Sequence, residues 1–334
     1  MKKLTVSASP HAHSSETTTG IMLDVIISLL PAAIVSVFYF GLHAFAVLAT
    51  SIVSCVLFEY ISRKIMKRSN TVGDLSAVVT GIILAFNLPS TLPLWMVVIG
   101  SFIAIVIVKQ MFGGIGQNFV NPAITARIIL MSSFPLAMST WTQPLVTRTG
   151  EAVTTASPLA SLAGITKEAD MALALENANL PSLKDMFLGL RPGSMGEVCA
   201  AALLIGFVYL LIRRVISPII PLTFIGTVAV FMLIAGKGNL EFVVYQLLSG
   251  GLLLGAIFMA TDYTTSPINK KGKIIFGIGC GLITSVIRVF GLLPEGVSFS
   301  IILMNILVPH IENLTTPKPF GSVKEKKSKE GTAA

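Results

Sequence analysis

Charged residues are scarce in this chain. Lysine, arginine, aspartate and glutamate make up 12% of its 334 residues, whereas soluble globular domains carry about 25%. Hydrophobic residues make up 53%, and the mean hydropathy is +0.83. Because apolar runs of about 20 residues, the length that crosses a bilayer, recur along the sequence, the composition excludes a soluble protein. It predicts an all-α, polytopic membrane protein.

Cysteine and histidine are also rare. The three cysteines lie in separate apolar segments, which argues against a disulfide, a zinc site or a cysteine-ligated iron–sulfur cluster made by this chain alone. The histidines lie on a polar N-terminal arm or beside apolar runs, so they do not indicate a haem site. These residues are Cys55, Cys199, Cys280, His11, His13, His43 and His310.

Sequence signatures of nucleotide binding and metal-dependent hydrolysis are absent. There is no GxxxxGK[ST] loop, no GxGxxG after a strand and no HExxH motif, and Gly113-Gly-Ile-Gly116 matches none of them. We therefore expect no catalytic residue, no metal ligand and no NAD or ATP site in this chain.

The apolar runs predict ten transmembrane helices, some of them broken. They lie at residues 21–40, 43–62, 72–89, 92–109, 118–135, 195–212, 216–235, 241–260, 274–291 and 296–312. The first follows a polar stretch rather than a signal-like start, so it is expected to be an uncleaved anchor. The chain then divides into an N-terminal arm (1–20), a first membrane half (21–135), a polar loop (136–194), a second membrane half (195–312) and a basic tail (313–334).

Basic residues indicate the orientation. They cluster at residues 63–68, at 213–214, at 270–273 and in the tail. With the N-terminus in the cytoplasm, all four clusters lie inside and the sparsely basic loop 136–194 lies outside, as the positive-inside rule requires. Both termini are therefore expected in the cytoplasm. The net charge of +8 follows from this topology and does not indicate nucleic-acid binding.

Two of the predicted helices contain helix-breaking residues. The third ends in Asn87-Leu-Pro89, and the fifth contains Asn121-Pro122 after a glycine-rich stretch. Such breaks persist at membrane depth only where protein or a cavity satisfies the backbone. In addition, Val108-Lys-Gln-Met-Phe112-Gly113 resembles Ile287-Arg-Val-Phe290-Gly291. The resemblance indicates an internal repeat, of the kind that often frames a site near the midplane.

The polar loop contains a hydroxyl-rich segment, Glu151-Ala-Val-Thr-Thr-Ala-Ser157-Pro158-Leu159. A phosphate ester on serine or threonine needs an accessible hydroxyl on an extended backbone, and Pro158 biases Ser157 away from the helical region. On the outer face of the membrane, a covalent bond retains a cofactor that would be lost if it dissociated. The alternative is an ordinary Ser/Thr turn, and the segment by itself does not decide between them.

Over nearly its whole length the chain resembles the D subunit of the Rnf electron-transport complex (RnfD), a relative of the B subunit of the sodium-translocating NADH:quinone reductase. The matching motifs are Ser9-Pro10-His11-x-His13, Phe112-Gly-Gly-Ile-Gly-Gln-Asn-x-x-Asn121-Pro122-Ala, the segment from Glu151 to Leu159, Met259-Ala-Thr261-Asp262, Arg288-Val-Phe-Gly-x-x-Pro294-Glu295-Gly296-Val, Asn305-x-Leu-Val-Pro309 and Pro317-Lys-Pro-Phe-Gly321.

The resemblance implies FMN bound covalently on the outward side through its phosphate. Glu151 takes the place of the acidic residue of the family motif, Ala156 that of the alanine, and Ser157 that of the acceptor, with Thr155 and Thr154 as fallback acceptors. The chain departs from the motif in having glutamate for the usual aspartate and serine for the usual threonine. Serine is chemically competent, so Ser157 is the expected site.

A second, non-covalent flavin such as riboflavin, within the membrane, is also implied. Gly113 and Gly114 would let the backbone approach the ring, Asn121 belongs to the same segment, and Arg127 would stabilise a reduced, anionic flavin. The alternative for the glycines is tight helix packing, and for Arg127 a topological or pairing role.

Acidic residues within or beside the apolar helices are candidates for an ion path, because charges there are expensive and usually functional. Asp24, Glu59 and Asp262 are the three we expect along such a path. Their closeness to helix ends leaves a second explanation, namely solvation at the membrane interface. Arg288 and Glu295 are further charges of this kind.

The leading hypothesis is a flavoprotein subunit of a complex in the bacterial cytoplasmic membrane. By resemblance, the complex moves electrons between ferredoxin and NAD and couples them to Na⁺ or H⁺ translocation. The implied partners are the flavin-bearing G subunit, the A and E membrane subunits, the B and C subunits with iron–sulfur clusters and flavin, a flavin transferase and the lipid bilayer. The alternatives are a solute channel or secondary transporter without a redox cofactor, and a scaffold that only anchors redox partners.

Overall fold

The computed structural model describes residues 16–145, 154–155, 157–163, 165, 173, 175, 177–178, 180–197, 199–291 and 295–317. Most of these residues lie in helices. Within the described ranges, the only strands are β1 (Trp141–Thr142) and β2 (Thr154–Thr155), which pair antiparallel. The all-α prediction is therefore confirmed.

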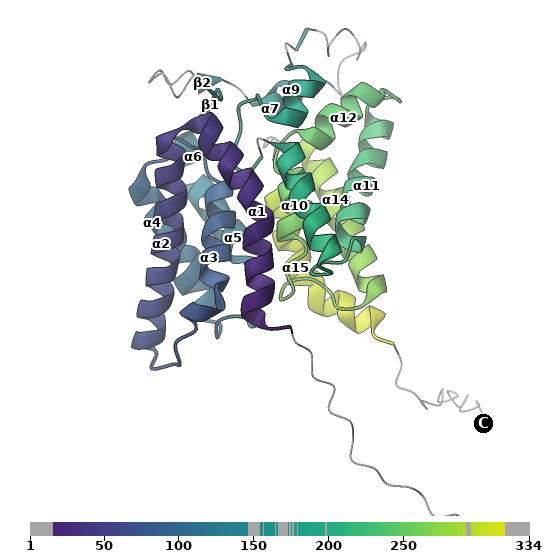
Figure 1. Cartoon of the computed structure of the whole chain (residues 1–334). Coiled ribbons are helices and arrows are strands. Elements are labelled where there is room, and N and C mark those ends of the chain that lie inside the picture. Colours follow the sequence, from purple (N-terminus) through teal and green to yellow (C-terminus); the bar gives the residue numbers. More distant parts are fainter. Residues whose placement is uncertain are drawn as a thin grey trace, which may run out of the picture.

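The helices form two bundles that stand side by side (Figure 1). The first bundle consists of α1 (Thr18–Phe40), α2 (Leu42–Ile65), η1 (Val72–Asp74), α3 (Ser76–Phe86), α4 (Leu94–Phe102), η2 (Ile103–Gln110), α5 (Pro122–Ser133) and α6 (Pro135–Met138). The second consists of α10 (Ala200–Ile212), α11 (Ile219–Ala235), α12 (Leu240–Leu248), α13 (Leu252–Leu254), η5 (Gly255–Met259), α14 (Lys270–Phe290) and α15 (Val297–Thr315). Between them in sequence lie α7 (Pro158–Leu162) and α9 (Leu183–Leu188).

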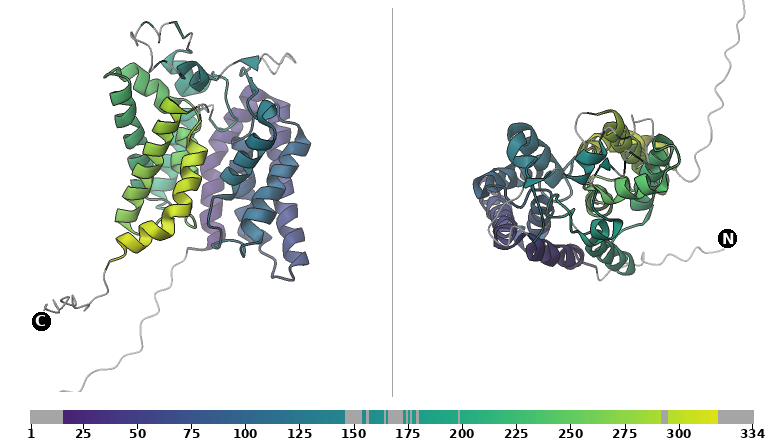
Figure 2. Two further views of the ribbon diagram at one scale, coloured as in Figure 1. Left: turned by 180° about the vertical axis from the view of Figure 1, so that it is seen from behind. Right: turned by 90° about the horizontal axis from the view of Figure 1, so that it is seen from above.

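Both ends of the described chain lie at one face of the bundles. The β1–β2 pair, α7 and α9 lie at the opposite face (Figures 1 and 2). We call these the terminal face and the loop face. Asp24 near the start of α1 pairs with Arg213 after α10, and Thr19 donates to the carbonyl of Gly73 beyond α2. Glu312 in α15 accepts from the backbone just before α14. The basic residues around these connections therefore gather at the terminal face.

The ten segments predicted to cross the membrane each contain a helix, but their lengths differ. Among the described residues, α1, α2, α14 and α15 are long and apolar enough to cross a bilayer. The pair α12 and α13–η5 is a fifth candidate, bent by 66°. The helices α3, α4–η2, α5, α10 and α11 are apolar but shorter. The structure is that of a polytopic helical membrane protein in which five of the ten segments form helices of 17 residues or fewer.

The two predicted breaks are present, and they make α3 and α5 shorter than expected. α3 ends at Phe86 rather than at residue 89. The Asn87 side chain donates to the Ile83 carbonyl at 2.7 Å, and the helix does not continue because Pro89 has no N–H. α5 begins at Pro122 rather than at residue 118, because the Asn121 side chain caps its first turn.

The span predicted over residues 241–260 is a bent pair of helices rather than one continuous helix. α12 ends at Leu248, and the Ser249 N–H donates to the Tyr245 carbonyl at 2.9 Å. Gly250 has a φ of 67°, which glycine adopts without a steric penalty. The chain then turns into α13 and η5. Like η2 in the first bundle, η5 is π-helical, a wide-turn geometry that is frequent at functional sites.

Small residues bring α11 and α14 together. Gly277 and Gly281 lie four residues apart on the face of α14 that packs on α11. A Cβ atom on Gly281 would lie 2.6 Å from Thr227 Cβ and 2.9 Å from the Phe224 carbonyl oxygen. Because lipid tails are as apolar as side chains, close packing of this kind, rather than the hydrophobic effect, holds helices together in a membrane.

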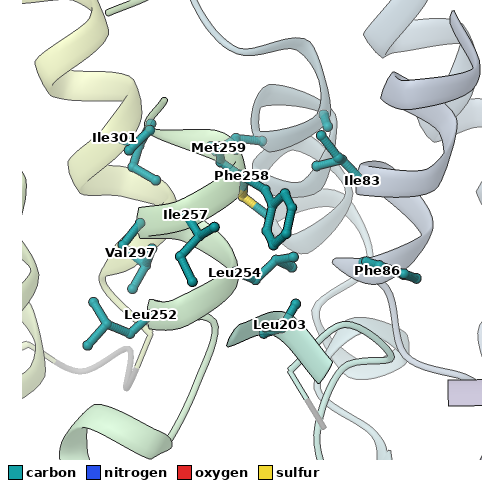
Figure 3. Packing of buried hydrophobic residues seen from close by; sticks show 14 of the residues in the cluster. Ile83, Phe86, Leu203, Leu252, Leu254, Ile257, Phe258, Met259, Val297 and Ile301 are labelled. Carbon is teal, nitrogen blue, oxygen red and sulfur yellow. The ribbon is translucent and has the colours of Figure 1, made fainter. Parts of the chain in front are cut away.

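An apolar layer joins the two bundles (Figure 3). Ile83 and Phe86 of α3 belong to the same buried cluster as Leu254 and Phe258 of α13–η5, and Leu203 of α10 is part of it. The bundles therefore share one core.

The order of elements also repeats. α3, a segment of turns, α4–η2, a loop and α5 follow one another in the first bundle, and α13–η5, a segment of turns, α14, a loop and α15 follow in the second. α3 begins at the terminal face and α13 near the loop face, so the two units run in opposite directions. This inverted order agrees with the predicted repeat, and it places Lys109 and Arg288 at matching positions near the ends of η2 and α14.

Candidate functional site

A cavity of about 390 Å³ lies between the two bundles. Its walls come from α1, α3, the segment before α5, η5 and residues 261–264, and most of them are apolar. Its size lies within the range of small-molecule sites. It extends inward from the terminal face, because its lining includes the first turn of α1. The polar residues on its walls include Ser76, Lys109, Asn118, Asn121, Asp262 and Thr264.

Lys109 brings a buried positive charge to the cavity wall. Its Nζ lies 2.8 Å from Glu59 Oε2 and donates to Ser76 Oγ at 2.6 Å, and Thr71 donates to the other Glu59 oxygen at 2.8 Å. The Lys109 and Glu59 side chains are 4% and 1% exposed. Two charges this deeply buried are tolerable only when they are paired and hydrogen-bonded, as these are.

Asp262 lines the cavity from the second bundle, in the segment that follows η5. Its carboxylate accepts from the Thr264 hydroxyl at 3.1 Å and from the Thr265 hydroxyl at 3.4 Å. Asn118 of the first bundle donates to the same Thr264 hydroxyl at 3.2 Å. This carboxylate is therefore held by the second bundle and linked through Thr264 to the first.

The N-terminal end of α5 and the C-terminal end of η5 meet at Asn121. The Asn121 side chain accepts from two backbone N–H groups of α5 and donates to the Met259 carbonyl at 3.3 Å. The Asn305 side-chain amide is oriented so that both its oxygen and its nitrogen have hydrogen-bond partners. In this orientation the Asn305 side-chain oxygen accepts from the Asn121 backbone N–H at 3.2 Å. Asparagine side chains from the two bundles thus satisfy backbone groups at the start of α5 and the end of η5.

Five charged side chains meet between the bundles on the loop-face side. We call them the Arg127 cluster; its members are Arg127, Arg191, Glu197, Arg288 and Glu295. Arg127 on α5 donates to Asn87 Oδ1 at 2.6 Å, contacts Glu295, and lies 3.7 Å from Glu197 Oε1. Its side chain is 3% exposed. This geometry supports the pairing role for Arg127 that the sequence left open.

Backbone pairing brings Glu197 into this cluster. The Met195 N–H donates to the Leu88 carbonyl at 3.2 Å, and the Gly196 N–H donates to the Phe86 carbonyl at 2.9 Å. The end of the long loop therefore pairs with the break that follows α3, which carries Glu197 to Arg127.

The other two arginines hold backbone carbonyls. Arg288 donates to the Gln246 carbonyl at 2.6 Å and to the Ser249 carbonyl at 3.0 Å, so it satisfies the C-terminal end of α12, where a cation is also favoured by the helix dipole. Arg191 donates to the Glu197 carbonyl at 2.6 Å. Burial lowers the pKa of Arg191 to about 10, and Glu197 opposes that change.

Ser157 lies at the loop face, half-buried, with an extended backbone (φ −68°, ψ 149°). Its Oγ accepts from the Ala160 N–H at 3.2 Å and so caps α7. The Thr155 Oγ is enclosed and has no hydrogen-bond partner among the described residues. Of Thr154, the structure describes only the backbone in β2, opposite Thr142. Glu151 and Ala156 lie outside the described residues, as do His11 and His13.

The remaining predicted site residues lie apart from the cavity. Asp24 pairs with Arg213 at 3.2 Å and accepts from Tyr209 at 2.8 Å, so it joins α1 to α10. Gly113 and Gly114 have φ values of 130° and 103° and form the turn after η2. Neither glycine is among the residues that line the cavity.

Several residues of these sites were not predicted. The sequence did contain a signal for Lys109, because a charged residue at the end of an apolar run is a candidate functional residue. Arg191 and Glu197 had none, since they are loop residues whose burial depends on the pairing of that loop with the break after α3. Asn118 and Thr264 belong to quoted or neighbouring motifs but meet only in the tertiary structure.

These features define a polytopic helical membrane protein with inverted units, a cavity between its bundles toward one face and a buried ionic cluster toward the other. The sequence matches the NQR2, RnfD, RnfE family over residues 5–321, and the chain belongs to this family.

Curated relatives match along almost the full chain. The D subunit of the Na⁺-translocating ferredoxin:NAD⁺ oxidoreductase complex of Acetobacterium woodii is 47% identical over 326 residues, which cover 97% of each chain. The D subunit of the proton-translocating ferredoxin:NAD⁺ oxidoreductase complex of Clostridium ljungdahlii is 43% identical over 323 residues, covering 95% of this chain and 96% of the relative. The D subunit of the ion-translocating oxidoreductase complex of Stutzerimonas stutzeri is 38% identical over 327 residues, covering 90% and 91%.

Proposed function

We propose that this chain is the D subunit of an ion-translocating ferredoxin:NAD⁺ oxidoreductase complex in the bacterial cytoplasmic membrane. The observation that carries the proposal is the similarity over almost the full length to the D subunits of such complexes. The terminal face is cytoplasmic and the loop face is external, because the basic residues around α2, α10 and α14 gather at the terminal face. The G, A, E, B and C subunits supply the remaining redox centres and membrane helices.

The acceptor for covalent FMN in this proposal is Ser157. The residues present fit a phosphate ester: the Ser157 backbone is extended and its side chain is partly accessible, whereas the Thr155 hydroxyl is enclosed. A flavin transferase needs an accessible hydroxyl, and this difference supports Ser157 rather than Thr155 as the acceptor. FMN bound there supplies one- and two-electron chemistry, and the protein holds it at a fixed place on the loop face.

The cavity is the proposed place for a second, non-covalent flavin such as riboflavin. Its apolar walls suit the faces of a flat ring, and Lys109, Asn118 and Asn121 offer hydrogen-bond donors around it. Asn121 is thus the one member of the predicted flavin-contacting set that lines this cavity. Gly113, Gly114 and Arg127 stand outside it, with Arg127 already bonded to Asn87 and two carboxylates.

The proposed ion path uses Asp262 and Glu59, and it starts at the terminal face. Asp262 lines the cavity, and Glu59 lies behind Lys109, which also lines it. Asp24 is bonded to α10 and has no part in this path. The Acetobacterium woodii and Clostridium ljungdahlii relatives are named for different ions, Na⁺ and H⁺. The proposal therefore does not specify the coupling ion.

Fluorescence of the denatured chain under ultraviolet light tests the proposal. The chain is purified from cells that contain the flavin transferase and separated on a denaturing gel. We expect a fluorescent band for the wild type and a dark band for Ser157→Ala. Ser157→Thr restores fluorescence, and Ser161→Ala, which removes a hydroxyl from the same short helix, keeps it.

The rival functions give other results. A solute channel, a secondary transporter or a passive scaffold has no use for a tethered flavin, so each gives a dark wild-type band. A dark wild-type band from cells with an active transferase therefore refutes the covalent flavin. A fluorescent Ser157→Ala band shows that the flavin is attached to another residue. Thr154 and Thr155 are then tested in the same way.

A further inference from the structure

The Arg127 cluster lies directly beneath the segment that carries Ser157. A Cβ atom on Gly250 would lie 2.9 Å from Leu159 Cδ2 of α7 and 3.0 Å from Arg288 Nη2. Leu159 follows Ser157 by two residues, and Ser157 caps the same helix. Arg288 of the cluster and Leu159 of the helix that Ser157 caps therefore both lie against Gly250, and the proposed function gives the cluster no role.

Glu295 is the acid of this cluster with a buried oxygen that no hydrogen bond satisfies among the described residues. It lies in the connection between α14 and α15; one of its oxygens contacts Arg127, and the other has no hydrogen-bond partner among the described residues. The charged groups that face it are Arg127 from α5, Glu197 from the segment before α10, and Arg288 from α14. From the α12–α13 turn it meets Gly251, which adds no charge.

Burial raises the pKa of the Glu295 carboxyl to about 7; Arg127 opposes that change, Glu197 adds to it, and Arg288 opposes it. The proton affinity of this group therefore responds to charge nearby. With both acids ionised the cluster holds three positive and two negative charges, and a proton on Glu295 raises its net charge by one.

We infer that Glu295 is a proton-accepting positioning residue that binds one proton when the FMN proposed on Ser157 takes up one electron. The inference rests on the proposed function. The electron comes from a one-electron carrier in a partner subunit, the proton comes from water at the loop face, and an O–H bond forms on the carboxylate. The charge beneath α7 then rises by one as that on the flavin falls by one. This compensation matters because an added charge in a low-dielectric region is costly.

The midpoint potential of the bound FMN tests the inference in the purified complex. It is measured at pH 6 and pH 8 for the wild type, Glu295→Gln and Glu241→Gln. At pH 8 we expect Glu295→Gln to shift the one-electron reduction equilibrium on the order of tenfold toward the reduced form, about 59 mV, because a negative charge that opposes reduction is removed. At pH 6 the wild-type carboxyl is already protonated, so the two potentials agree.

Glu241→Gln is the matched control. Glu241 lies in the first turn of α12 on the same face, but it is exposed, so its replacement leaves the potential unchanged at both pH values. A Glu295→Gln difference of equal size at pH 6 and pH 8, or no difference at either, overturns the inference. The gel fluorescence of each variant confirms that FMN is attached, so a failure of the proposed function is recognised separately by a dark wild-type band.

A second measurement covers the case in which Glu295→Gln does not assemble. The infrared difference spectrum between oxidised and reduced wild-type complex is recorded at pH 8. The appearance on reduction of a protonated carboxyl band that shifts in heavy water supports the inference. Its absence overturns the inference.

Discussion

Removal of the Arg127 guanidinium is expected to destabilise the chain strongly. Arg127→Met keeps most of the side-chain volume but leaves Glu295 and Glu197 without their shared cation. Because the Arg127 and Glu197 side chains are 3% and 8% exposed, water cannot replace the lost interaction. Breaking a buried ion pair by removing one partner costs about 3–5 kcal/mol, and the loss of the hydrogen bond to Asn87 falls within that figure.

The magnitude is tested with a double-mutant cycle. Glu295→Gln removes the charge that Arg127→Met leaves uncompensated, so the double variant is expected to lose less than the sum of the two single variants. Coupling energies between contacting groups are about 0.5–3 kcal/mol. The free energy of unfolding is measured by circular dichroism during titration of mixed detergent micelles with a denaturing detergent.

Arg213→Met supplies the matched control. The same substitution there removes the pair with Asp24, but the Arg213 side chain is 58% exposed, so the expected loss is about 0–1 kcal/mol. The reasoning fails if Arg127→Met costs no more than Arg213→Met. It fails equally if the losses of the Arg127 and Glu295 variants simply add.

Three further predictions follow from other contacts. Lys109→Met leaves Glu59 buried without a cation and is expected to cost about 3–5 kcal/mol in the same titration; a loss below about 1 kcal/mol contradicts the pairing. Gly281→Leu forces α14 away from α11 and is expected to cost about 1–3 kcal/mol or more. Gly226→Leu on α11, where a Cβ atom meets nothing within 4 Å, is expected to be neutral. Equal losses of stability in the two variants contradict the packing argument. Asp262→Asn is expected to lower ion uptake by vesicles that contain the complex while the gel fluorescence persists, and unchanged uptake removes Asp262 from the proposed path.

Local sequence patterns predicted the helices well where one residue type dominates. Long apolar runs became α1, α2, α14 and α15, although Pro31 lies inside α1 and Pro309 inside α15. The breaks at Asn87 and Asn121 were also predictable, since proline and the capping preference of asparagine act within a single turn. The bend at Gly250 was missed: Ser249-Gly250-Gly251 is a turn signal, but glycine permits a turn without requiring one, and apolar stretches flank it on both sides.

The candidate sites show the same division. The hydroxyl-rich segment around Ser157 was visible in the sequence because it is a short linear pattern. The Glu59–Lys109 pair was not, since its partners lie fifty residues apart and only helix packing brings them within 2.8 Å. Asp24, Glu59 and Asp262 looked alike in sequence as acids near helix ends. Their surroundings differ completely: Asp24 is bonded to an exposed arginine, Glu59 to a buried lysine, and Asp262 to hydroxyl groups on the cavity wall.

The sequence by itself determined the class of the protein, its two breaks and the hydroxyl segment of its loop, since each is a property of neighbouring residues and of their transfer from water to lipid. Only the tertiary structure decided where the charges meet. Arg127, Glu197 and Glu295 come from a helix, a loop and a connection that are distant along the chain, and each is tolerable in the membrane only in the presence of the others. Such mutual compensation depends on three-dimensional proximity, which no linear pattern of residues specifies.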